Sequence, residues 1–294
     1  MSAILSQPAG TKQRSRKRGF LGRFLRKPGA TFGAVTVLSF ILIAIFAPGL
    51  APYPPDQMIY TAIQQPPSAA HPMGTDELGR DILSRVIHGA RISMQVGLIA
   101  VGIALTVGTL LGILAAFAGG FVNDVIMRVV DVMLAFPDIL LAIAIVAILG
   151  PDLVNTMIAV GIAAIPAYAR TAQASTLSVL ELDYVQAARA LGASGFRIVW
   201  RYILPNIFAP IVVLASVGVA VAILSAAGLS YLGLGAQPPT PEWGAMLSGA
   251  RAYLRDAWWM STFPGLVIVI VVLAFNLLGD GLRDLLDPRL GNRA

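Results

Sequence analysis

One stretch of this sequence restricts the fold more than any other. From Asn206 to Pro241 the chain contains no Asp, Glu, Lys or Arg, and most of its side chains are apolar. A helix needs about 20 consecutive apolar residues to cross a bilayer. The whole chain is 57% hydrophobic and only 12% charged, whereas soluble domains have about 25% charged residues. These features predict an all-α, polytopic membrane protein.

The apolar runs predict six transmembrane helices. The third and fourth are near the lower length limit for a span, and the segment 121–136, which carries Asp124, Arg128 and Asp131, is interpreted as an elbow on the cytoplasmic side. Gly108 and Gly112 fit a small-xxx-small packing pattern, although glycine is common in membrane helices. The predicted spans are 30–50, 92–117, 137–149, 153–168, 207–232 and 262–278.

The basic residues predict the orientation. Eight of the 21 lie in a tail, 1–29, that has no acidic residue, and this placement indicates a cytoplasmic flank rather than a nucleic-acid-binding arm. With both termini in the cytoplasm, 16 basic residues lie inside and five outside. A cleaved signal peptide would have an apolar core of about 7–15 residues, which favours an uncleaved first span. The resulting division is a tail (1–29), a first span (30–50), an extracytoplasmic loop with an interfacial helix (51–91), a core (92–280) and a tail (281–294).

The segment 181–206 carries charges between two apolar runs and predicts two short helices joined by a turn. Asp183 is the expected N-cap of the first, and Gln186 completes a capping-box pattern. Gly192 is expected to adopt the left-handed conformation that ends a helix. Ser194 is expected to cap a second helix, which Pro205 interrupts. From the residues alone, an amphipathic loop resting on the membrane surface is an equally good interpretation.

The spacing in this segment resembles the EAA loop of ABC-importer permeases. The chain has Gln186 where that family usually has Glu, so an ion pair made there in relatives is not carried over. The end of the pattern is matched only loosely, because Ile203 and Leu204 are adjacent. The resemblance implies a type I ABC-importer permease fold, in which this loop is the coupling helix that docks in a groove of an ATPase subunit. The coupling residues it implies are Asp183, Gln186, Ala187, Ala188, Arg189, Gly192, Ile203, Leu204 and Pro205.

A second motif lies in residues 71–93. Its apolar residues Leu78, Ile82, Leu83 and Val86 share one helical face, which predicts a short interfacial helix with Arg80, Asp81 and Arg85 mostly off that face. The segment closely resembles the GTDxxGRDxxSRxxxGxRxS pattern of C-type dipeptide and oligopeptide permeases, and 233–247 and 263–290 are similar to the same family. The spacing of His71 and His88 matches no common metal-ligand set, so no metal site is predicted.

Motifs for energy-driving chemistry are missing from the sequence. It has no phosphate-binding loop and no metalloprotease or nucleophile-elbow motif, and the span interiors lack the ionisable residues common in proton-coupled carriers. We therefore expect no enzyme activity and no cofactor in this chain. Neutral polar groups are the candidates for a translocation path: Thr106, Thr109, Asn155, Thr156, Ser216 and Ser225.

The resemblance also implies partners and a location. Such a permease works in the bacterial inner membrane with a second, homologous permease, two ATP-binding subunits that use ATP and Mg, and an extracytoplasmic substrate-binding protein. Its solutes are dipeptides, oligopeptides, glutathione, nickel complexes or related small molecules. The alternative is a membrane assembly or docking protein that transports nothing itself.

Overall fold

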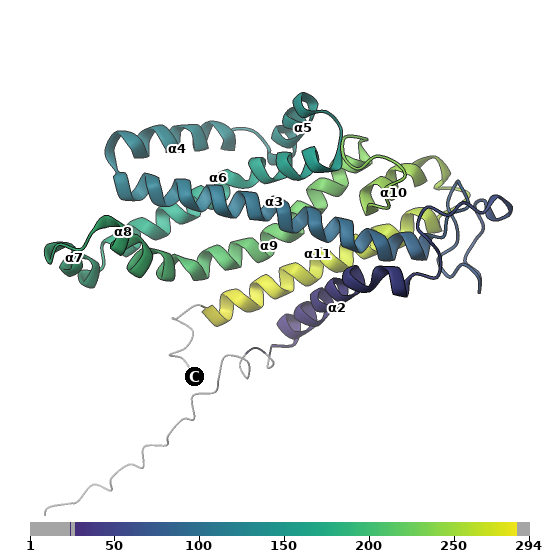
Figure 1. Cartoon of the computed structure of the whole chain (residues 1–294), viewed down its shortest axis with the longest axis horizontal. Coiled ribbons are helices and arrows are strands. Elements are labelled where there is room, and N and C mark those ends of the chain that lie inside the picture. Colours follow the sequence, from purple (N-terminus) through teal and green to yellow (C-terminus); the bar gives the residue numbers. More distant parts are fainter. Residues whose placement is uncertain (1–23, 25–26, 287–294) are drawn as a thin grey trace, which may run out of the picture.

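Long helices lie side by side along the long axis of the molecule (Figure 1). The computed structural model describes residues 24 and 27–286, and within these residues the regular elements are helices, without a β-strand. Five helical stretches are long and apolar enough to cross a membrane, and a sixth crossing results if the bent pair α4–α5 counts as one span. The prediction of an all-α, polytopic membrane fold is confirmed.

The helix bounds follow the predicted spans with several extensions. The bundle helices are α2 (Pro28–Leu50), α3 (Ile82–Ala118), α4 (Gly120–Leu134), α5 (Asp138–Leu149), α6 (Leu153–Leu180), α9 (Leu204–Tyr231) and α11 (Trp259–Leu286). Shorter elements are η1 (Tyr60–Ala62), α7 (Asp183–Ala190), α8 (Gly195–Ile198), the π-helical turn η2 (Val199–Ile203), α10 (Trp243–Ala250) and η3 (Arg251–Tyr253).

The most extensive helix contact joins α3 to α6, and two glycines make it possible. A Cβ atom on Gly108 would lie 2.6 Å from the Cβ of Tyr168, and one on Gly112 would lie 2.7 Å from the Cβ of Ala172. Real Cβ atoms do not approach neighbours this closely. The small-xxx-small pattern is therefore a packing surface, which decides the question that the sequence left open.

The predicted elbow at 121–136 is wrong. These residues belong to α4, which runs back along α3 and α6 and ends at a 95° bend before α5. One of the three charged residues that suggested an elbow, Asp131, pairs with Arg170 of α6, and Gln173 of α6 donates a hydrogen bond to Asn123 of α4. Pairing lowers the cost of polar groups on a helix in this position.

Three further boundaries differ from the prediction. The fourth span is not short, because α6 continues past Pro166 to Leu180, and the sixth reaches from Trp259 to Leu286. The interfacial helix is not separate, because Ile82 begins the 37-residue helix α3 that also forms the second span. The residues before it, 71–81, form an irregular loop.

Candidate functional site

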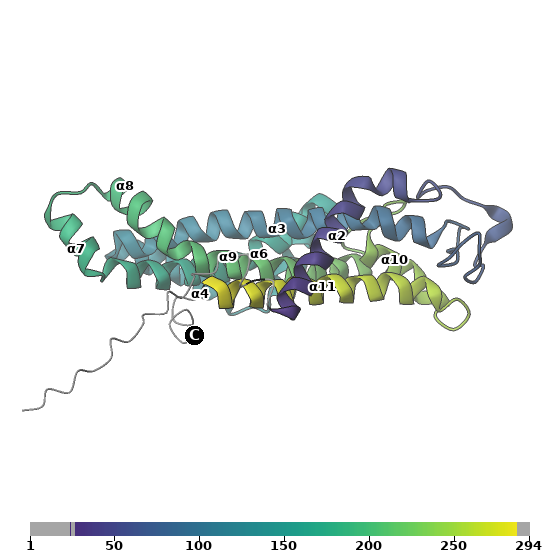
Figure 2. The ribbon, with the colours of Figure 1, turned by 90° about the horizontal axis from the view of Figure 1, so that it is seen from below.

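Helices α7 and α8 extend beyond the spans at one end of the bundle, and residues 51–81 lie at the other end (Figure 2). Gly192 ends the first of these short helices with φ +79°, as predicted, because glycine adopts the left-handed conformation without a steric penalty. Ser194 accepts a hydrogen bond from the backbone N–H of Arg197 and caps α8, also as predicted. The chain therefore makes the expected helix–turn–helix.

The start of α7 differs from the predicted capping box. Leu182 is the N-cap residue, and Asp183 is already in the first turn, where its charge still suits the helix dipole. The Gln186 side chain instead donates a hydrogen bond of 2.7 Å to the carbonyl oxygen of Leu180. A glutamate carboxylate is unable to donate this bond, so the departure from the family pattern has a structural role here.

The inner face of the two helices is fixed to the bundle. Val185 of α7, Ile198 of α8 and Ile203 of η2 are buried in one cluster with side chains of α3, α6 and α9. Asn206 of α9 also donates a hydrogen bond of 3.1 Å to the Tyr184 hydroxyl of α7, between two exposed side chains. The segment is thus a packed extension of the bundle, which argues against a loop lying loosely on the membrane surface.

Pro205 does not interrupt the second helix, contrary to the prediction. The backbone N–H of Leu204 donates to the carbonyl of Val199, five residues earlier, so η2 is a π-helical turn. This wider turn directly precedes Pro205, the second residue of α9, and the helical backbone continues past the proline. The chain consequently continues as one long helical stretch from Gly195 to Tyr231.

Three large apolar side chains are exposed at the end of α7, on α8 and on η2. Leu191 is 88% exposed, Phe196 74% and Trp200 60%, and the rings of Phe196 and Trp200 lie 5.9 Å apart. We call these three residues the apolar tip. Large exposed apolar side chains grouped at one place are typical of a protein-contact surface. Sequence reasoning concentrated on the small alanines and missed the tip, although the i, i+4 spacing of Phe196 and Trp200 signals a shared helical face.

The predicted coupling residues divide into three groups by burial. Asp183, Gln186, Ala187, Arg189, Gly192 and Pro205 are exposed, Ala188 and Leu204 are partly buried, and Ile203 is buried. Ala187 is therefore more accessible than Ala188. Which of these residues touches an ATPase stays a prediction, and Ile203 supports the segment from within.

The six predicted path residues are not gathered at one place. Thr109 and Thr156 are buried, and Thr156 donates to the carbonyls of Asp152 and Leu234. Asn155 donates to the carbonyls of Leu149 and Gly150, near the start of α6. The hydroxyls of Thr106 and Ser216 are bonded to carbonyls of their own helices, and Ser225 lies partly buried on α9. Their role in transport stays a prediction.

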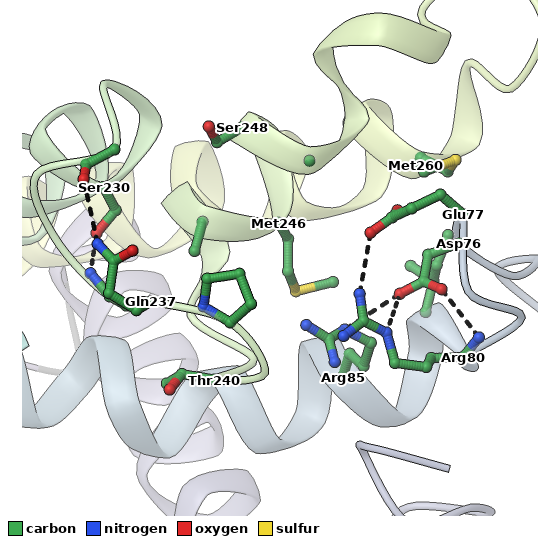
Figure 3. A pocket seen from close by; sticks show the side chains of 16 residues that line it. Asp76, Glu77, Arg80, Arg85, Ser230, Gln237, Thr240, Met246, Ser248 and Met260 are labelled. Atoms are coloured by element: carbon green, nitrogen blue, oxygen red, sulfur yellow. Dashed lines mark hydrogen bonds and ion pairs between the residues drawn. The ribbon is translucent and has the colours of Figure 1, made fainter. Parts of the chain in front are cut away.

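The opposite end of the bundle holds a buried charge network. Arg80 and Arg85 are 5% and 4% exposed, and the Nε atom of Arg80 lies 2.6 Å from Oδ2 of Asp76 (Figure 3). Asp81 caps α3 by accepting from the backbone N–H and the hydroxyl of Ser84. The predicted apolar face is only partly confirmed: Ile82 and Val86 are buried, but the charged residues Arg80, Asp81 and Arg85 are buried as well, and Leu78 is 38% exposed.

Glu242 completes this end. It caps α10 by accepting the backbone N–H groups of Gly244 at 2.9 Å and Ala245 at 2.8 Å. The residue is only 2% exposed, and burial raises the pKa of its carboxyl above the ordinary value of 4.5. Neither the buried arginines nor this acid was singled out by the sequence as a site.

Comparison with known proteins identifies the family. Residues 108–292 match the family described as the inner-membrane component of binding-protein-dependent transport systems. Residues 15–67 match the N-terminal transmembrane domain of oligopeptide transport permease C. Both matches agree with the motifs found in the sequence.

The names of individual relatives agree with these family matches. The chain is 50% identical over 281 residues to a di/tripeptide transport system permease of Pseudomonas aeruginosa, covering 94% of this chain and 93% of the relative. It is 48% identical over 274 residues to a glutathione transport system permease of Pectobacterium atrosepticum, covering 93% and 91%.

Solved structures support the fold. The inward-facing MetNI methionine ABC transporter superposes with a TM-score of 0.58 at 18% identity, covering 70% of this chain and 98% of the transporter chain. An amino acid ABC transporter gives a TM-score of 0.51 at 15% identity, covering 68% and 94%. The chain therefore belongs to the binding-protein-dependent transport system inner-membrane components, the permease subunits of ABC importers.

Proposed function

We propose that this chain is the C-type permease subunit of an importer for short peptides, and that α7–α8 is where ATP-hydrolysing subunits act on it. The relatives named above serve di/tripeptide and glutathione transport. Their solutes are short peptides with free carboxylates. We therefore assign the same class of solute to this chain.

The observation that carries this proposal is the two-sided construction of α7–α8. The apolar tip faces outward, while Val185, Ile198 and Ile203 fix the inner side to the bundle. A partner that bound the apolar tip would therefore move packed helices rather than a free loop. Rigid-body movement of helices at a subunit interface is a common means of switching between conformations.

The proposed assembly has two ATP-binding subunits, which supply ATP and Mg, a second, homologous permease and an extracytoplasmic substrate-binding protein. The charge distribution supports an orientation with both termini in the cytoplasm, since the eight basic residues of the tail 1–29 then lie inside together with Arg189, Arg197 and Arg201. The chain has no cysteine, so single cysteine probes report without background. In intact cells, Ser194→Cys should resist an impermeant thiol reagent and Ser68→Cys should react; the reverse pattern would overturn the orientation.

Reconstitution tests the function itself. The complete complex in liposomes should take up labelled alanyl-alanine when ATP and the binding protein are supplied, and this chain alone should neither hydrolyse ATP nor transport. The assembly or docking alternative predicts a stable complex with no uptake. ATP turnover by the purified chain, shown to be free of other subunits, would contradict the assignment of hydrolysis to partners.

A further inference from the structure

A cavity of about 300 Å³ lies at the end of the bundle opposite α7–α8. It is bounded by the start of α3 and the loop before it, by the loop that follows α9, and by α10 (Figure 3). Its apolar wall includes Ile82, Met246 and Met260. Its charged lining includes Arg80, Arg85 and Glu77. The proposed coupling mechanism uses none of these residues.

The first arginine at this cavity is paired with two carboxylates. Nε of Arg80 bonds Oδ2 of Asp76 at 2.6 Å, and its Nη2 bonds Oε1 of Glu77 at 3.0 Å. The other oxygen of Asp76 accepts the backbone N–H groups of Leu78 and Arg80, each at 2.9 Å. The Asp76 carboxylate is therefore already engaged on both oxygens.

The second arginine, by contrast, has no carboxylate of the described residues within hydrogen-bond distance. Nη1 of Arg85 donates to the carbonyl oxygens of Pro55 at 3.0 Å and Pro239 at 3.3 Å, and its Nε lies 3.6 Å from the occupied Asp76 carboxylate. Asp56 is 3.7 Å from Nη1 and is more than half exposed. Nη2 makes no hydrogen bond to the described part of the chain. A guanidinium has five donors, and a buried charge without a full set of partners is costly.

This unfilled donor is at the cavity. The Arg85 guanidinium lies beside Arg80 and below Met246, facing the loop that contains Thr240 (Figure 3). A carboxylate is the ligand that best fits a guanidinium, since two oxygens match the planar fork of N–H groups. Beside Arg80, only one oxygen of Glu77 has a hydrogen bond within the described residues, so the other remains to accept from an ammonium group. The methionines offer an adaptable apolar wall for a side chain.

We propose that this cavity binds the free C-terminal carboxylate of a short peptide through Arg85 before the peptide crosses the membrane. The class of solute comes from the proposed function, on which this proposal rests. The new elements are the cavity where the peptide binds and the arginine that contacts its carboxylate. A cavity of about 300 Å³ is at the small end of the range for ligand sites, which suits a dipeptide or the last residues of a longer peptide. Arg80 holds the Asp76 and Glu77 carboxylates in place and so positions the site.

A cysteine probe tests this site without transport. Thr240 lines the cavity and its hydroxyl makes no hydrogen bond within the described residues, so Thr240→Cys should disturb little. The complete complex in nanodiscs, without binding protein or ATP, would be treated with a neutral maleimide. Alanyl-alanine at 10 mM should slow the labelling of Cys at 240 by at least threefold, and alanyl-alanine amide should not. Ser68→Cys, exposed at the same end and outside the cavity, is the matched control.

Two variants sharpen the result. Arg85→Gln in the Thr240→Cys background should abolish protection, and Arg85→Lys, which keeps charge but loses the fork, should weaken it. If Arg85→Gln fails to assemble, the comparison of alanyl-alanine with its amide in the Thr240→Cys complex still tests the proposal. Equal protection by acid and amide, protection by sodium acetate at the same concentration, or no protection by either peptide would overturn the proposal. Protection by peptide-free binding protein alone would assign the cavity to protein contact instead. Each of these results leaves ATP-driven uptake, the test of the proposed function, as a separate measurement.

Discussion

The guanidinium of Arg189 on α7 lies 5.6 Å from the centroid of the Phe117 ring, in the last turn of α3. The same ring fills the space beside Gly195 of α8, where a Cβ atom would lie 3.1 Å from two ring atoms. One aromatic side chain thus joins both short helices to the end of a membrane span. Movement of α7–α8 therefore has a direct route to α3 and, through the packed glycine surface, to α6.

Replacing Phe117 with Leu keeps apolar volume but removes the aromatic face. A cation–π contact at an exposed site contributes about 0.5–1 kcal/mol, which corresponds to about two- to fivefold in an equilibrium. We expect ATP turnover to persist and uptake per ATP to fall by about this factor, measured in proteoliposomes. Phe121→Leu is the control, because that ring is 81% exposed at the start of α4. Unchanged uptake per ATP in Phe117→Leu would show that this contact transmits nothing.

The apolar tip should supply binding energy to the ATPase subunits. Burying a large apolar side chain contributes about 1.5–3 kcal/mol, and 1.4 kcal/mol is about tenfold in affinity. Trp200→Ser should therefore weaken binding of the ATPase subunits about tenfold or more, measured by titrating them onto the permease pair in nanodiscs. Trp258→Ser, at an exposed tryptophan of the opposite end, should leave that affinity unchanged. Equal affinities for the two variants would argue against the tip as a docking surface.

The α3–α6 contact gives a stability prediction with a control on the same helix. An added methyl at Gly112 would overlap Ala172, whereas nothing lies within 4 Å of a Cβ atom at Gly102. Overpacking costs about 1–3 kcal/mol, while Gly→Ala on an open helix surface gains up to about 1 kcal/mol. Gly112→Ala should lower the melting temperature of the purified complex, and Gly102→Ala should leave it equal or higher. A drop of the same size in both variants would contradict this packing.

Glu242 gives a prediction on pH. Burial raises the pKa of its carboxyl in the folded state above 4.5, so its contribution to stability is fully present below that value and is lost as the pH rises through the raised pKa. The wild-type melting temperature should therefore fall as the pH rises above 4.5, relative to that of Glu242→Gln, which does not ionise. Glu242→Gln also loses one acceptor of the α10 cap, at a cost of about 0.5–1.5 kcal/mol at all pH values. A constant difference between the two proteins across this range would show that the carboxyl does not titrate there.

Local signals in the sequence predicted much of this structure. The first span, the Gly192 turn and the Ser194 cap depend on neighbouring residues or on apolar run length, and both can be read along the chain. The bounds of α6 and α11 were too short because hydropathy falls at Arg170 and at Asp280, while the helical backbone continues past both residues.

Features that depend on distant partners were not predictable in this way. The polar residues of α4 looked like an elbow because Arg170, 39 positions away from Asp131, is not visible as its partner in the sequence. In the sequence, Arg80 and Arg85 resembled the polar face of a surface helix. In the structure they are covered by α10 and by the loop that follows α9. Whether the apolar tip is buried or exposed is likewise decided by tertiary packing alone.

The central claim is that ATPase subunits drive this permease through α7–α8, and an aspartate on α7 tests it most directly. Ala188→Asp would place an unpaired charge in a dry contact, which costs several kcal/mol and should weaken docking about a hundredfold or more. Ala187→Asp tests the more exposed neighbour, where the fold of α7 tolerates the change, and Ala69→Asp at the opposite end is the control. The measurement is co-purification of the ATPase subunits together with ATP-driven alanyl-alanine uptake by the same preparation. We predict loss of both in Ala188→Asp and Ala187→Asp with normal membrane insertion, and retention of ATPase co-purification in Ala69→Asp. Wild-type docking and uptake in both α7 variants would contradict the claim.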